Sequence, residues 1–163
     1  GDTIVLRSPV SYDEDHAADT ILPGITRSSV LALGRLLGMD VRVEDITLSE
    51  LLDLPADVAR QTVVFTTGTA AGIAPVVALL GPKRETWRFA VWDDIDDSAR
   101  LRRLTADEGP SGSALEAARR LRTVLFRVQL GDLDGLREVA PDHADAVLDY
   151  AADNGWLETF AVS

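Results

Sequence analysis

Threonines and a glycine stand close together in residues 65–75, between two apolar runs. The runs, residues 62–65 and 73–80, have the length and the β-branched composition of buried strands. Gly68 lets the backbone turn without a Cβ, and the threonine hydroxyls stand beside backbone N–H groups that no helix or ladder has claimed. These donors predict a turn that can hold an anion.

A second candidate for anion binding lies about forty residues earlier, at residues 21–27. It precedes a helical pattern that places Val30, Leu33 and Leu37 on one face and that predicts a helix from Gly24 to Leu37, ending at Gly38. The residues from Gly24 to Thr26 then form the start of the helix, where the first N–H groups are unpaired and the helix dipole favours negative charge.

Taken together, Ile21-Leu22-Pro23-Gly24-Ile25-Thr26-Arg27 and Phe65-Thr66-Thr67-Gly68-Thr69-Ala70-Ala71 resemble the class IV (fold type IV) pyridoxal-phosphate aminotransferases. Within that class the chain is most similar to the branched-chain amino-acid aminotransferases. The resemblance is specific over residues 20–77 and becomes loose from residue 78 onward. It implies an α/β fold in which residues 1–163 form a single domain similar to the C-terminal, larger domain of those enzymes.

The resemblance also implies which residues contact the cofactor. The helix start and the turn would grip the phosphate of pyridoxal phosphate together, and the same turn would meet the substrate carboxylate through the N–H groups of Thr69 and Ala70. No catalytic residue is assigned. The implied cofactor-binding residues are Gly24, Ile25, Thr26, Gly68, Thr69 and Ala70.

The lysine on which this family forms its Schiff base lies in the part of the enzyme that precedes the first motif. Lys83 is the only lysine here, and its Gly-Pro context predicts a solvated turn rather than the tuned setting that such a lysine needs. We therefore expect the chain to correspond to the C-terminal half of such an enzyme and not to act as a transaminase alone.

Three functions remain open at this point. The chain can be a subunit of a split pyridoxal-phosphate enzyme whose lysine-bearing half is a partner chain. It can be a stand-alone lyase, isomerase or cyclase that uses the same anion pocket without a cofactor. It can also be a non-catalytic binding or assembly subunit, because folds do not determine chemistry. Each predicts a small anionic or amino-acid-like ligand, and the family's dimers make a homo-oligomer plausible.

Composition narrows the classes of protein to consider. The 163 residues are 46 % hydrophobic, as in an ordinary globular domain. We expect no membrane span and no signal peptide, because no long apolar run is present. The absence of cysteine gives no reason to expect an oxidising compartment, so the prediction is cytoplasmic. A net charge of −11 opposes binding to nucleic acid.

Two acidic segments suggest metal binding at first sight. His16 follows three consecutive carboxylates, which point in different directions and favour a solvated loop. Residues 93–97 hold four aspartates but lack the spacing, the glycine and the distal glutamate of a calcium-binding EF-hand loop. No metal site is predicted.

Hydrophobic periodicity and capping signals predict the remaining elements. A capping box at Thr47 and Glu50 opens a short helix limited by Pro55, and a long helix runs from Ser113 to Gly131, with several arginines of which one could face an anion. His143 is expected at the surface or in a cap. The other predicted elements are strands at 3–6, 39–43, 86–92 and 156–162 and a helix at 141–150.

Overall fold

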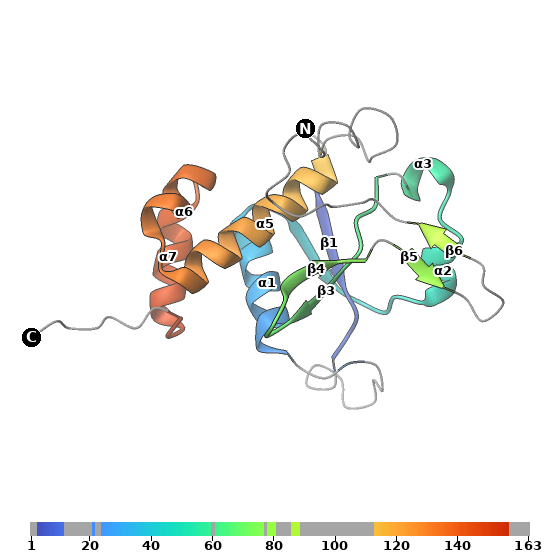
Figure 1. The fold of residues 1–163 in the computed structure, drawn as a ribbon, viewed down its shortest axis with the longest axis horizontal. Coiled ribbons are helices and arrows are strands. Elements are labelled where there is room, and N and C mark those ends of the chain that lie inside the picture. The colour runs from blue at the N-terminus through green and yellow to red at the C-terminus, as the bar shows by residue number, and fades with distance from the viewer. Residues whose placement is uncertain are drawn as a thin grey trace, which may run out of the picture.

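The computed structural model describes residues 3–11, 21, 24–59, 61–76, 78–80, 86–88 and 113–156. The first described part of the chain holds short strands and helices, with four strands in succession at its end, and three helices complete the described residues (Figure 1). The described strands form three two-stranded sheets, one parallel and two antiparallel. The predicted mixed α/β fold is therefore confirmed at the level of fold class.

The parallel sheet joins β1 (Val5–Ser8) to β2 (Asp40–Val43), with Val5 opposite Asp40. Parallel strands need a crossover connection, and α1 (Ile25–Leu36) lies in it. Gly38 has a φ of 79°, which suits the residue that follows a helix end. The predicted helix and the predicted strand after it are both confirmed, while β1 begins two residues later than expected.

The segment with the threonines forms an antiparallel hairpin of β3 (Phe65–Gly68) and β4 (Gly72–Pro75). The expected strand at 62–65 is wrong in position, because pairing starts at Phe65. The run at 73–80 is two strands rather than one: β4 ends at Pro75, whose nitrogen cannot donate to a ladder, and β5 (Ala78–Leu80) pairs instead with β6 (Thr86–Arg88).

Two short helices lie between β2 and β3. In α2 (Leu48–Leu52) the Thr47 side chain accepts a hydrogen bond from the Glu50 N–H, and the Glu50 side chain accepts one from the Thr47 N–H. The predicted capping box is thus confirmed. The helix α3 (Ala56–Ala59) was not predicted, because four residues carry too little periodicity to be recognised.

The last three described helices are α5 (Ser113–Leu130), α6 (Leu133–Val139) and α7 (Ala144–Asp153). The long helix confirms the prediction for 113–131, and α7 begins three residues later than expected. The helix α6 was not predicted; Asp132 begins it by accepting a hydrogen bond from the Gly135 N–H. In Figure 1, α5 crosses α1, against which it packs, and α6 and α7 lie together at one end.

The hydrophobic core lies between α1 and α5 and continues into α6 and α7. Leu33 of α1, Val124 of α5, Leu136 of α6 and Val147 of α7 are all fully buried in one cluster. Ile73 of β4 joins the same cluster, so the hairpin is held against the helices by an apolar anchor. This packing positions the turn of the hairpin beside α5.

Several predictions fall outside the described residues. They concern the loop with His16, Lys83, the strand residues beyond Arg88, the aspartates at 93–97 and a last strand after Trp156.

Candidate functional site

The turn of the hairpin consists of Thr69, Ala70 and Ala71, all exposed. Gly72 follows with a φ of 61°, the left-handed conformation that closes a three-residue hairpin loop. The expectation that Gly68 supplies the sharp turn is wrong. Gly68 pairs with Gly72 as the last residue of β3, and Gly72 takes the positive φ instead.

The turn forms one wall of a hollow of about 460 Å³, and α5 forms the other. Thr69 and Ala70 line it on the hairpin side. Arg122, Phe126 and Gln129 line it from α5. The hollow therefore combines hydrogen-bond donors from two elements with an aromatic wall.

The start of α1 opens onto a different hollow, of about 430 Å³. Gly24 is the N-cap and provides no side-chain hydrogen bond, so no side chain of that residue covers the first N–H groups. Ile25 is 86 % exposed, whereas Thr26 is only 8 % exposed. The far wall of this hollow comes from the end of α7, where Tyr150 packs edge-on against Trp156 with ring centroids 5.2 Å apart.

Four of the six predicted contact residues thus line hollows, in two separate pairs. Gly24 and Ile25 line the one at α1, and Thr69 and Ala70 line the one at α5. Thr26 and Gly68 line neither of these two hollows. The elements themselves are neighbours, since α1 packs against β3, and Figure 1 shows the hairpin tip and the start of α1 at the same end of the molecule.

The start of α1 is held in place by a buried arginine that sequence reasoning left without a role. Arg27 is 8 % exposed. Its Nε donates to Ser8 Oγ at 2.8 Å and its Nη2 to the Pro9 carbonyl oxygen at 2.7 Å, with Ser11 Oγ at 3.5 Å from Nη1. These contacts tie the first turn of α1 to the end of β1. The position of Arg27 in the first turn, on the buried side of the helix, was the signal in the helical pattern from which this role could have been predicted.

The arginines of α5 have different surroundings. Arg120 donates to the Val139 carbonyl oxygen at 3.3 Å, and its Nη2 lies 3.4 Å from His143 Nδ1. Arg127 pairs with Asp132. Arg122 is the α5 arginine that lines the hollow beside the turn. Among the described residues, none accepts a hydrogen bond from Arg119 Nε or Nη2, although both atoms are buried.

His143 is the N-cap of α7 and is partly buried, but its side chain makes no capping hydrogen bond. It stands at the cap position that was expected, but its side chain does not cap the helix and lies beside Arg120 instead.

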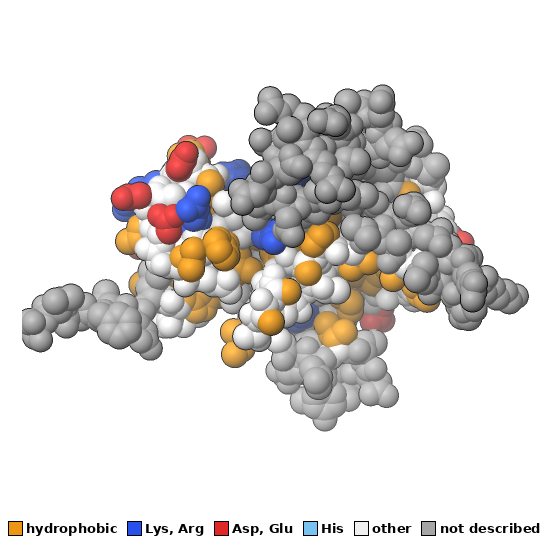
Figure 2. Space-filling model, in the orientation of Figure 1, with side chains coloured by type: hydrophobic (Ala, Val, Ile, Leu, Met, Phe, Trp, Pro, Cys, Tyr) orange, Lys and Arg blue, Asp and Glu red, His pale blue; other side chains and the backbone are white. Residues whose placement is uncertain are grey.

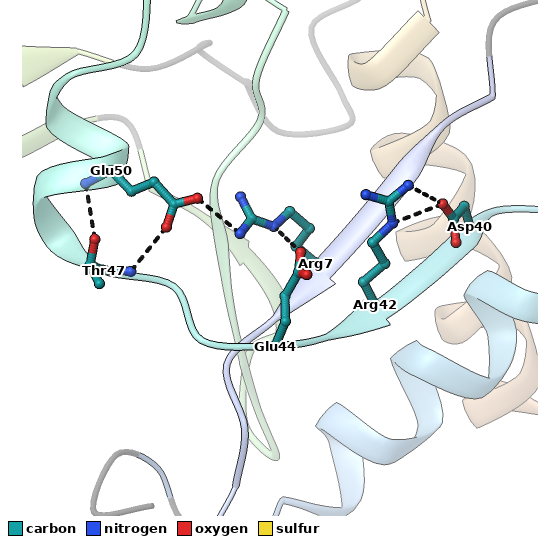
Figure 3. Close-up of polar contacts among 6 residues, drawn as sticks. All are labelled: Arg7, Asp40, Arg42, Glu44, Thr47 and Glu50. Atoms are coloured by element: carbon teal, nitrogen blue, oxygen red, sulfur yellow. Dashed lines mark hydrogen bonds and ion pairs between the residues drawn. The ribbon is translucent and has the colours of Figure 1, made fainter.

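The ion pairs of β1, β2 and α2 form a group (Figure 3), and none of their residues lines either hollow. Arg7 bridges Glu44 and Glu50, the latter at 3.0 Å, and Arg42 pairs with Asp40. The hydrogen bond from Arg7, together with the one from the Thr47 N–H, lowers the pKa of Glu50. Such exposed pairs contribute little to stability individually and mainly hold the local geometry.

On α6, the N–H of Gly135 and then the guanidinium of Arg127 lower the pKa of Asp132. The described residues include no group of three or more His, Asp or Glu side chains that could hold a metal ion. The helices in the same part of the chain include none that is long and apolar enough to cross a membrane.

Comparison with known proteins gives partial matches to one group of enzymes. The chain is 42 % identical over 66 residues to a probable branched-chain-amino-acid aminotransferase of Staphylococcus aureus (strain N315), covering 40 % of this chain and 18 % of the relative. It is 32 % identical over 112 residues to branched-chain-amino-acid aminotransferase 3, chloroplastic, of Arabidopsis thaliana, covering 69 % of this chain and 20 % of the relative.

A third match, 47 % identical over 57 residues, is branched-chain amino acid aminotransferase 2, chloroplastic, of Humulus lupulus; it covers 35 % of this chain and 12 % of the relative. No protein-family model matches the chain, and no solved structure matches it significantly. The first two of these matches span about a fifth of the relatives' length. Over these partial stretches the chain is related to the branched-chain amino-acid aminotransferases.

Proposed function

We propose that this chain supplies the anion-binding part of an aminotransferase-like site for pyridoxal phosphate, with the lysine-bearing half on a partner chain. The relation to branched-chain amino-acid aminotransferases supports the reaction class. The observation that carries the proposal is the start of α1, where a glycine N-cap leaves the first N–H groups without a side-chain cap beside an open hollow.

The donors at this helix start fit a phosphate group. The first backbone N–H groups of a helix point out of its start, where Gly24 and Ile25 line the hollow, and the helix dipole adds a favourable field for negative charge. Gly24, Ile25 and Thr26 would hold the phosphate. Bound pyridoxal phosphate supplies an electron sink for chemistry at an amino acid, which the side chains themselves cannot provide.

The hairpin turn contributes a second set of donors in this proposal. Gly68 ends β3, and the exposed Thr69 and Ala70 follow it with N–H groups beyond the last paired residues of the hairpin. These groups would bind a carboxylate of the substrate, while the Thr69 hydroxyl would take part at the phosphate. Arg27 acts indirectly, because its hydrogen bonds to the end of β1 keep the first turn of α1 in position.

Binding of inorganic phosphate and of pyridoxal phosphate to the wild type, Thr26→Ala and Thr69→Ala tests the proposal. A hydrogen bond to a charged group contributes about 1.5–3 kcal/mol, so each variant should bind about 10 to 100 times more weakly. Thr66→Ala is the matched control, because Thr66 is exposed on the same hairpin and does not line the hollow at α5. Equal affinity in all four proteins would remove both hydroxyls from the site.

The isolated chain should form no covalent adduct with pyridoxal phosphate and show no transamination, because Lys83 is its only lysine and lies outside the matched motifs. Absorbance spectroscopy with the cofactor checks this. An adduct that disappears in Lys83→Ala would make Lys83 the anchor and contradict the need for a partner chain. Turnover of a substrate without any cofactor would instead favour a lyase, isomerase or cyclase.

A further inference from the structure

Two aromatic rings form the far wall of the hollow at the start of α1. Tyr150 lies in the last turn of α7 and Trp156 follows the end of that helix, with the ring centroids 5.2 Å apart and the ring planes at 75°. Both residues are only partly buried, and both line the hollow of about 430 Å³. This volume lies within the range of small-molecule sites. Each ring therefore keeps some of its surface available to a ligand.

The backbone after α7 holds Trp156 in place. Its N–H donates to the Ala151 carbonyl oxygen at 2.7 Å, and the Gly155 N–H donates to the Ala152 carbonyl oxygen at 3.1 Å. With a φ of 69° at Gly155, these two bonds form a Schellman motif, which sets the residue after the glycine against the last turn of the helix. Trp156 also packs against the hydrophobic core. The aromatic wall is thus preorganised, so a ligand that covers it has little side-chain freedom to remove.

The surroundings of the two rings are uncharged. The wall formed by α1 contributes Gly24, Ile25 and Ser28, and none of the described residues that line the hollow carries a charge. In Figure 2 the charged side chains visible at this end of the molecule gather over α6 rather than over the end of α7. A planar ring can extend the edge-on pair in such a setting, because aromatic rings favour edge-on and offset contacts and are removed from water together.

We propose that Tyr150 and Trp156 select the ligand of this hollow by binding the planar ring of a phosphate ester whose phosphate lies at the start of α1. The inference rests on the proposed function for the position of the phosphate. It adds a ring-binding wall from α7 and from the turn after it, far outside residues 20–77, over which the resemblance to aminotransferases is specific. A phosphate ester without a ring leaves this wall in contact with water and binds more weakly.

Titration calorimetry of the whole chain with two phosphate esters tests the inference. Pyridoxine 5′-phosphate carries the ring, with an alcohol in place of the aldehyde, so it forms no Schiff base with Lys83. Glycerol 3-phosphate carries the phosphate on an aliphatic group of three carbons. The wild type should bind the ester with the ring about 10 times more tightly.

Replacement of the indole separates ring binding from phosphate binding. Trp156→Leu keeps an apolar side chain against the last turn of α7 but offers no ring, so it should lose most of the preference for pyridoxine 5′-phosphate and bind glycerol 3-phosphate as the wild type does. Trp156→Phe should keep part of the preference, since it keeps a ring. A purely structural role of Trp156 would instead weaken the binding of both esters equally, and that result would overturn the inference.

Phe126→Leu is the comparison for the loss of an exposed ring. Phe126 is 53 % exposed and lines the other hollow, beside the hairpin. It should keep the preference of the wild type, and a preference lost in Phe126→Leu but kept in Trp156→Leu would place the ring in the other hollow. A wild type that binds both esters equally, or neither, overturns the inference without any variant, so misfolding of a variant cannot protect it.

The outcome is separable from that of the proposed function. Phosphate binding that depends on Thr26, together with equal affinity of the wild type for the two esters, would leave the proposed function standing and overturn this inference. A preference for the ring that depends on Trp156, together with unchanged phosphate binding in Thr26→Ala and Thr69→Ala, would do the reverse.

Discussion

Replacing Arg27 by methionine should destabilise the protein more than a charge removed from the surface. Arg27 is 8 % exposed, and its two short hydrogen bonds, 2.8 Å to Ser8 Oγ and 2.7 Å to the Pro9 carbonyl oxygen, join α1 to the end of β1. Methionine fills part of the volume but donates nothing, so Ser8, itself 9 % exposed, and the Pro9 carbonyl lose a partner.

The magnitude follows from these two contacts. Each hydrogen bond from a charged donor contributes about 1.5–3 kcal/mol, and part of this is offset because a charge is no longer buried. We expect the free energy of unfolding to fall by about 3 kcal/mol. For a chain of this size that corresponds to a loss of about 6–12 °C in melting temperature.

Arg35→Met is the matched control, because Arg35 is exposed in the last turn of the same helix. Its favourable interaction with the helix dipole is worth about 0.3–1 kcal/mol. Thermal unfolding followed by circular dichroism, together with urea unfolding, measures both variants. Equal losses in the two would refute the view that Arg27 anchors the start of α1, and a stabilised Arg27→Met would refute it more strongly.

Three further outcomes are expected. Gly34→Ala should lower the free energy of unfolding, measured with urea, by about 1 kcal/mol. The added Cβ would stand 2.7 Å from Leu6 Cδ2, and this overpacking costs more than the gain in helix propensity. Stability should fall with acidification below pH 4.5, the ordinary pKa of Glu50, because Arg7 lowers the pKa of Glu50 in the folded state. The stabilisation by ionised Glu50 is fully present above pH 4.5 and is lost as the pH falls through the folded-state pKa. Glu50→Gln should therefore flatten the dependence of melting temperature on pH in this range. Arg119→Met should raise the urea midpoint and increase the free energy of unfolding by about 1 kcal/mol, because it removes buried donors that have no acceptor among the described residues.

The first two of these have a control on the same chain. Gly24→Ala should cost less than Gly34→Ala, because its Cβ meets its nearest neighbour at an ordinary 3.6 Å. Glu138→Gln, exposed on α6, is the comparison for Glu50→Gln, and identical acid profiles for the two would contradict the role of Arg7. A lower urea midpoint for Arg119→Met would show that the guanidinium contributes a stabilising contact.

Most of the helices were predictable because their signals are local. The apolar spacing of Val30, Leu33 and Leu37 and the glycine after them defined α1, and the Thr47 capping box defined the start of α2. The apolar residues at helical spacing from Leu115 to Val128 indicated α5, and the structure buries Leu115, Ala118, Leu121, Leu125 and Val128. Each signal involves residues within a few turns of one another, so no tertiary contact was needed to read it.

The short elements and the exact strand limits were not predictable in the same way. The strand run at 73–80 is apolar throughout, but its residues pair with two different partners, Phe65 to Gly68 and Thr86 to Arg88. Which partner a strand takes depends on packing between segments that are distant in the chain. The identity of the turn glycine, Gly72 rather than Gly68, followed from the same pairing.

By itself, the sequence determined the two donor-rich motifs, because helix starts and glycine-containing turns follow from neighbouring residue types. Only the tertiary structure decided what surrounds them. It buried Arg27 against Ser8 and Pro9, and it placed Arg122, rather than another arginine of α5, in the hollow beside Thr69. The physical reason is that burial and shared cavities are properties of surfaces brought together by folding, and no periodicity along a single segment encodes which surfaces meet.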